Sequence, residues 1–89
     1  MKKLTPERQA TVLAAIITGK KAFDEYAARK LNTFTDEGRQ VITVYWNAQA
    51  TITDILGTSM TRTERLIQGT ATLSDYYDEN GKPLKASTN

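Results

Sequence analysis

The chain has 89 residues, of which 39% are hydrophobic and 25% are charged, with a formal net charge of +2. This length fits one small domain, and the composition is typical of a globular protein. The sequence contains no cysteine and no histidine, which excludes disulfides, zinc fingers and catalysis by either residue. A chain this short buries only about 60–65% of its unfolded surface, so a partner subunit would add to a thin core.

Charge and hydropathy predict a soluble protein without a membrane segment. The net charge is too small to indicate nucleic-acid binding by itself. No apolar stretch suited to a signal peptide follows Lys2 and Lys3, and the longest apolar run covers only residues 12–17. A membrane-spanning helix needs roughly 20 apolar residues. We therefore expect a cytoplasmic location.

The first predicted helix covers residues 6–31. Thr5 is a suitable N-cap, and Pro6 fits the first helical position. Apolar residues then recur at spacings of three and four, and we expect them to face inward: Leu13, Ile16, Ile17, Phe23, Ala27 and Leu31. The spacing stays in phase across Gly19, which favours one helix. A break at Gly19 is the alternative, because glycine costs about 1 kcal/mol relative to alanine inside a helix.

The second predicted helix covers residues 38–57. Thr35 can cap it, Phe34 is placed to pack back onto it as a hydrophobic staple, and Gly57 fits its C-cap. The run of β-branched and aromatic residues at 41–46 also permits a β-hairpin over residues 41–53. However, residues 47–50 lack the glycine or proline of a tight turn, and the helical periodicity extends over 18 residues. We therefore expect a helix here.

The third predicted helix covers residues 62–77, with Leu66, Ile67, Leu73 and Tyr77 facing inward. A polar turn and a flexible tail at 84–89 follow, so the domain covers residues 1–83. Short connections make neighbouring helices antiparallel. The predicted fold is all-α, with three helices: a long antiparallel helical hairpin and a shorter third helix.

No constellation of residues indicates catalysis, a cofactor or a metal site. The acidic pairs at 24–25 and 36–37 are sequence neighbours, and adjacent side chains on a helix diverge by about 100°. The acidic stretch before Gly81 resembles a calcium loop, but Tyr76 and Ser87 occupy the two anchoring ligand positions. A polar turn explains it better. We expect a protein that is not an enzyme.

A helix-turn-helix over residues 50–68 is one functional hypothesis, and it would make the protein a small DNA-binding regulator. Apolar residues and Gly57 occupy several of the expected core and turn positions. Thr53, Thr58 and Thr63 depart from the pattern, because they stand where small or apolar residues are usual. The candidate DNA contacts are Arg62, Arg65, Lys20 and Lys21.

The most unusual feature is the segment from Gln40 to Thr61, which contains a single charged residue, Asp54. A surface helix normally carries charges on its outer face, whereas the core of a protein–protein contact is poor in charge and rich in aromatic residues. A central helix covered by its neighbours is the alternative explanation. We favour a non-catalytic regulatory, adaptor or inhibitor protein that binds another protein or self-associates through the uncharged helix at about 38–57. The candidate contacts are Val44, Tyr45, Trp46, Tyr76 and Tyr77.

Overall fold

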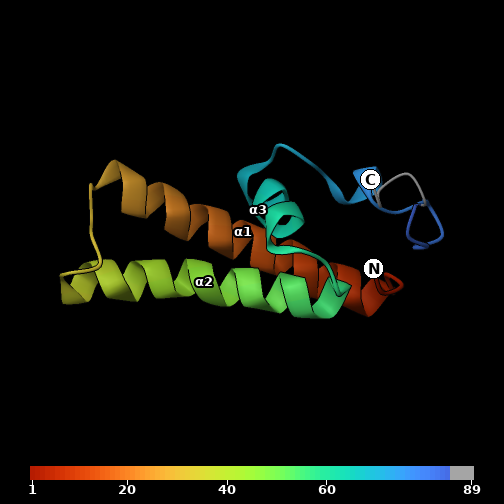
Figure 1. Cartoon of the computed structure of the whole chain (residues 1–89), viewed down its shortest axis with the longest axis horizontal. Coiled ribbons are helices and arrows are strands. Elements are labelled where there is room, and N and C mark those ends of the chain that lie inside the picture. The colour runs from red at the N-terminus through yellow and green to blue at the C-terminus, as the bar shows by residue number, and fades with distance from the viewer. Residues whose placement is uncertain (85–89) are drawn as a thin grey trace.

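Two long antiparallel helices, α1 (Pro6–Ala28) and α2 (Asp36–Leu56), form a hairpin in the computed structural model, which describes residues 1–84 (Figure 1). A short helix, α3 (Met60–Gln68), packs against the middle of this hairpin. A single turn of 3-10 helix, η1 (Leu73–Asp75), follows. Residues 1–84 contain no β-strand, so the predicted all-α fold is confirmed.

Helix α1 is continuous through Gly19, as the phase of its apolar residues predicts. Thr5 is the N-cap, and its hydroxyl accepts a hydrogen bond from the backbone N–H of Arg8. The helix ends at Ala28 rather than at residue 31, because Lys30 has a positive φ of 51° and the chain turns there. The predicted inward stripe is only partly right. Leu13 and Ile17 are exposed, whereas Val12, Gly19 and Ala22 are buried.

Helix α2 confirms the helical interpretation over the β-hairpin. The Thr35 hydroxyl accepts a hydrogen bond from the Gly38 N–H, and Gly57 ends the helix with φ 61°. The expected staple is wrong, because the Phe34 side chain is 91% exposed. The Phe34 N–H is instead bonded to the side chain of Asn32 in the loop.

Helix α3 is shorter than predicted. Ser59 is its N-cap, and Gly69 ends it at φ 81°. The predicted inward residues Leu66 and Ile67 are buried on the helix, but Tyr77 is buried in the loop that follows η1. The predicted helix of residues 62–77 is therefore two elements separated by a left-handed glycine.

The N-terminal segment is held between the end of α2 and the loop after η1. The backbone N–H of Lys2 donates to the carbonyl of Leu56, and that of Leu4 donates to Gly81. Leu84, where the flexible tail was expected to begin, donates its N–H to Tyr76. Residues 85–89 of that tail lie outside the described residues. Within residues 1–84, the structure contains no helix that is both long and apolar enough to span a membrane.

Candidate interaction surface

Three of the five candidate contact residues, Tyr45, Tyr76 and Tyr77, are buried within the monomer. The Tyr45 ring lies 5.0 Å from that of Phe23, measured between centroids, and its hydroxyl accepts a hydrogen bond from Gln49. The Tyr77 hydroxyl donates to the backbone carbonyl of Lys2 at 2.6 Å. These side chains contribute to the monomer core and are not surface anchors in this conformation.

The other two candidates, Val44 and Trp46, are exposed, with 41% and 51% of their surfaces accessible. They do not form one patch. Two residues apart on a helix, their side chains diverge by about 160°. Trp46 precedes Thr53 by seven residues and shares its side of α2, where α3 packs. Val44 lies on the opposite side, because nine residues separate it from Thr53.

The contacts of α3 show which side of the hairpin it covers. The Thr53 and Thr63 hydroxyls are 2.9 Å apart, and the Gln49 side chain donates to Glu64. On α1, the position of Gly19 adjoins Ile67 of α3. Ile17 precedes Gly19 by two residues and therefore points away from α3. The side of the hairpin that carries Ile17 and Val44 is thus free of α3.

A shallow apolar groove runs between α1 and α2 on that free side. Ile17 and Ala22 of α1 and Val41 and Val44 of α2 form its apolar lining, and its volume is about 590 Å³. Polar groups at its rim come from Thr18, Lys21, Glu25 and Gln40. Ile17 is 69% exposed, so most of its apolar side chain is accessible at the groove.

We call the surface around this groove the open face, defined by Ala10, Ala14, Ile17, Lys21, Val41 and Val44. The four α1 residues recur at spacings of three and four and are all exposed. Between Gln40 and Leu56, α2 contributes no charged residue to this side of the hairpin, whereas Glu37, one turn before Val41, lies on the same side and binds Arg29. Val41 and Val44 belong to the uncharged segment and lie on the side of the hairpin away from α3.

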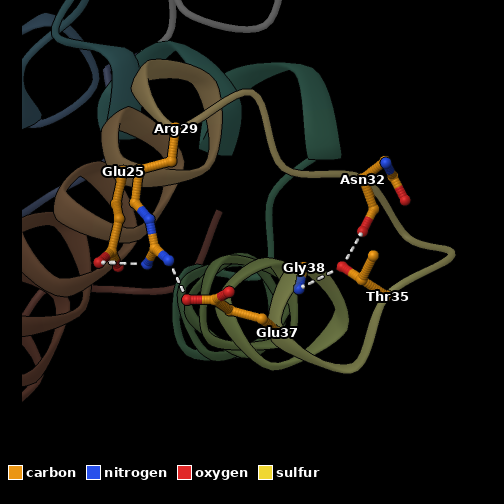
Figure 2. Close-up of polar contacts among 6 residues, drawn as sticks. All are labelled: Glu25, Arg29, Asn32, Thr35, Glu37 and Gly38. Carbon is orange, nitrogen blue, oxygen red and sulfur yellow. Dashed lines mark hydrogen bonds and ion pairs between the residues drawn. The ribbon is translucent and has the colours of Figure 1, made fainter.

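Polar contacts at the loop link the two helices beside the groove (Figure 2). The Arg29 guanidinium binds Glu25, at the groove rim, and Glu37, in the first turn of α2. The Asn32 carbonyl accepts from the Thr35 hydroxyl, which in turn accepts from the Gly38 N–H. Exposed ion pairs each add less than about 1 kcal/mol, but this set joins both helices and the loop.

The α2–α3 segment has some features of a helix-turn-helix. The connection contains three residues, 57–59, and Ile52, Leu56 and Leu66 are buried as the hypothesis requires. Two of the departures from the pattern compensate each other, since Thr53 and Thr63 are hydrogen-bonded together. The third, Thr58, has a buried hydroxyl without a hydrogen-bond partner in the described chain.

The candidate DNA contacts do not lie on one surface. The Arg62 guanidinium lies 5.6 Å from the centre of the Tyr76 ring, and Arg65 is exposed on α3. Lys20 forms an ion pair with Asp24, whereas Lys21 is at the rim of the groove on the side away from α3. The structure therefore separates Lys21 from the two arginines.

Several carboxylates of the described chain form local polar contacts. Asp36 binds Arg39, and Asp24 binds Lys20. The Asp78 carboxylate accepts from the N–H groups of Asn80 and Lys82, which confirms the polar turn before Pro83. Within residues 1–84, no three His, Cys, Asp or Glu side chains are grouped as metal ligands would be.

Comparison with known proteins gives no relative from which a function could be inferred: no family model, curated protein or solved structure matches this chain.

Sequence reasoning did not identify Ile17 as a surface residue. We expected it inside, because it is in phase with other apolar residues of α1. The structure instead buries small residues, Gly19 and Ala22, two and five residues further along α1. The signal available in the sequence was Gly19 itself, because a glycine inside a helix can mark a place where a second helix approaches closely.

Proposed function

We propose that this protein is a non-catalytic interaction module that self-associates through the open face of its α1–α2 hairpin. The observation that carries the proposal is the apolar groove on the side that α3 leaves free, with Ile17 and Val44 exposed in it. Covering these side chains with a second molecule would remove apolar surface from water, which is the main driving force of protein association.

The charge distribution supports this use of the hairpin. Along α2, from Gln40 to its end, the only charged residue is Asp54. Depletion of charge is typical of the buried centre of an interface, with charged residues at its rim. In the open face, Lys21 occupies such a rim position beside the apolar groove. A module of this kind would act in regulation or as an adaptor by presenting a helical surface.

A matched pair of substitutions on α2 tests the proposal and the choice of face. Val44→Lys places a charge in the groove, whereas Trp46→Lys places one on the opposite side of the same helix. Sedimentation equilibrium over a wide range of concentration should show self-association of the wild type. We expect Val44→Lys to raise the dimer dissociation constant by about tenfold or more, because an interfacial charge would be desolvated. We expect Trp46→Lys to resemble the wild type.

Two results would overturn the proposal. A wild-type chain that is monomeric at every concentration would remove self-association. Dissociation by Trp46→Lys and not by Val44→Lys would place the interface on the other side of α2. Circular dichroism of each variant shows whether the helices are intact, which keeps loss of folding distinct from loss of association.

The second candidate function is a DNA-binding regulator that uses the α2–α3 segment. The three-residue connection and the buried positions Ile52, Leu56 and Leu66 favour it. The exposed Arg65 would then contact phosphates or bases from α3. This function requires a duplex affinity that falls steeply with salt concentration and weakens in the Arg62→Ala/Arg65→Ala variant. An affinity unchanged by both arginine substitutions would reject it.

A further inference from the structure

We infer that two copies of this chain pair through α1 in an antiparallel orientation, with the two-fold axis beside Ala14. The inference rests on the proposed self-association and adds the geometry and the occupant of the open face, a second copy of the same helix. A two-fold interface is made of the same patch on both subunits, so each contact occurs twice.

The centre of the patch allows close approach of the two helices. Ala10 and Ala14 are exposed and lie on one side of α1, and their methyl groups leave room for an interhelical distance near the lower end of the usual range of about 8–10 Å. Because the axis passes beside Ala14, residues three positions before and after it face each other, so residue 17 of one copy lies opposite residue 11 of the second copy. The large exposed side chain of Ile17 then lies over Ala10 and Ala14 of the second copy.

The charges on the same side of α1 are complementary in this register. Glu7 and Lys21 are each seven residues from Ala14, or about 10 Å along the helix axis in opposite directions. Rotation about the axis therefore places Glu7 of each copy opposite Lys21 of the other. Both side chains are exposed, and neither forms an ion pair with any residue of 1–84. A parallel pairing in register would instead set like charges against each other.

The area available is of the same order as that of a standard interface. Helices α1 and α2 have 23 and 21 residues, so the side of the hairpin free of α3 is about 30 Å long and about 20 Å wide. Side-chain relief makes the accessible area larger than this projection. The surface is thus comparable with the roughly 800 Å² that one partner buries in a stable complex. The pairing also creates a four-helix arrangement from two hairpins, a common way to bury helix faces.

A cysteine placed on the axis gives a direct test, because the natural chain has no cysteine. In Ala14→Cys the two new thiols would be close enough to form a disulfide across the interface under mild oxidation. Ala28→Cys is the matched control: it is also an exposed alanine substituted in α1, but 14 residues from the axis. We expect Ala14→Cys to form covalent dimers at least about tenfold faster than Ala28→Cys.

Charge reversal tests the register independently. Glu7→Lys would set two ammonium groups opposite each other at both ends of the interface, and we expect the dissociation constant to rise about tenfold. Lys21→Glu should have a similar effect. The double variant Glu7→Lys/Lys21→Glu restores opposite charges across the axis, so its dissociation constant should return to within about threefold of the wild-type value.

The outcomes separate this inference from the proposed function. Faster cross-linking at residue 14 together with recovery in the double variant supports the antiparallel pairing. A wild-type dimer whose Ala14→Cys variant cross-links no faster than Ala28→Cys overturns the pairing and leaves self-association intact. A dimer in which the double reversal is as weak as the single ones also overturns the pairing. A wild-type monomer overturns both.

Discussion

Gly19 of α1 lies directly against Ala48 of α2, and a Cβ atom at position 19 would be 2.9 Å from the Cβ of Ala48. The same atom would be 3.3 Å from the terminal methyl of Ile67 in α3. All three helices therefore meet at a position where a hydrogen atom fits and a methyl group does not. This packing opposes the intrinsic helix propensity, which favours alanine over glycine by about 1 kcal/mol.

We predict that Gly19→Ala lowers the free energy of unfolding by about 1 kcal/mol or more, because overpacking costs about 1–3 kcal/mol and exceeds the gain in helix propensity. Urea unfolding followed by circular dichroism measures the change. Ala48→Gly makes room for the added methyl group, so Gly19→Ala should cost less in that background. An equal cost in both backgrounds would contradict the close contact.

Local signals in the sequence predicted most of the fold. Thr5, Thr35 and Gly57 mark ends of α1 and α2 through short-range hydrogen bonds and a left-handed glycine, and such signals are visible in a few neighbouring residues. The end of α3 was missed, although Gly69 is the same kind of signal as Gly57. Apolar residues beyond Gly69 extended the predicted helix, but they face the core from η1 and from the loop after it.

Tertiary contacts explain what the sequence did not reveal about the candidate site. Tyr45, Tyr76 and Tyr77 are aromatic residues that suit either a core or an interface, and only the folded chain shows that they are buried. Ile17 was expected inside but is exposed, because α1 packs through Gly19 against Ala48 and this directs Ile17, two residues away, toward the other side of the helix. Of the five predicted contact residues, Val44 alone lies in the open face.

The loop between α1 and α2 should be sensitive to a single methyl group. A Cβ atom at position 38 would overlap the backbone carbonyl oxygen of Asn32, which cannot move without breaking its hydrogen bond with Thr35. We predict that Gly38→Ala lowers the free energy of unfolding by about 2–4 kcal/mol. Gln40→Ala, at an exposed site in the same helix, is the control for helix propensity and should change stability by less than about 0.5 kcal/mol.

Two threonines near the start of α3 should respond in opposite directions to the same substitution. The buried Thr58 hydroxyl has no hydrogen-bond partner in residues 1–84, whereas the buried Thr63 hydroxyl is bonded to Thr53. Valine keeps the branched shape but removes the hydroxyl. We predict that Thr58→Val raises the free energy of unfolding by about 1 kcal/mol and that Thr63→Val lowers it by a similar amount. Thermal unfolding of both variants would measure the changes, and two shifts of the same sign would contradict this account.

Two buried tyrosines should make the fold sensitive to alkaline pH. Burial raises the pKa of Tyr77, an effect that nearby Arg8 opposes, and burial together with the Glu64 carboxylate raises the pKa of Tyr45. The folded state thus holds each phenolic proton more tightly than the unfolded chain does. The resulting stability is fully present below the ordinary tyrosine pKa of about 10 and is lost as pH rises through the folded-state pKa.

The Tyr77→Phe variant isolates the contribution of one of these groups. At neutral pH we expect it to be less stable by about 1 kcal/mol, because the hydrogen bond to the Lys2 carbonyl is lost. Above a pH of about 10, the wild type should lose stability faster than the variant, so the difference between them should shrink. Urea unfolding of both chains across this range provides the measurement, and lysine titration affects both equally. A difference that stays constant with pH would show that Tyr77 ionises equally readily in the folded and unfolded states.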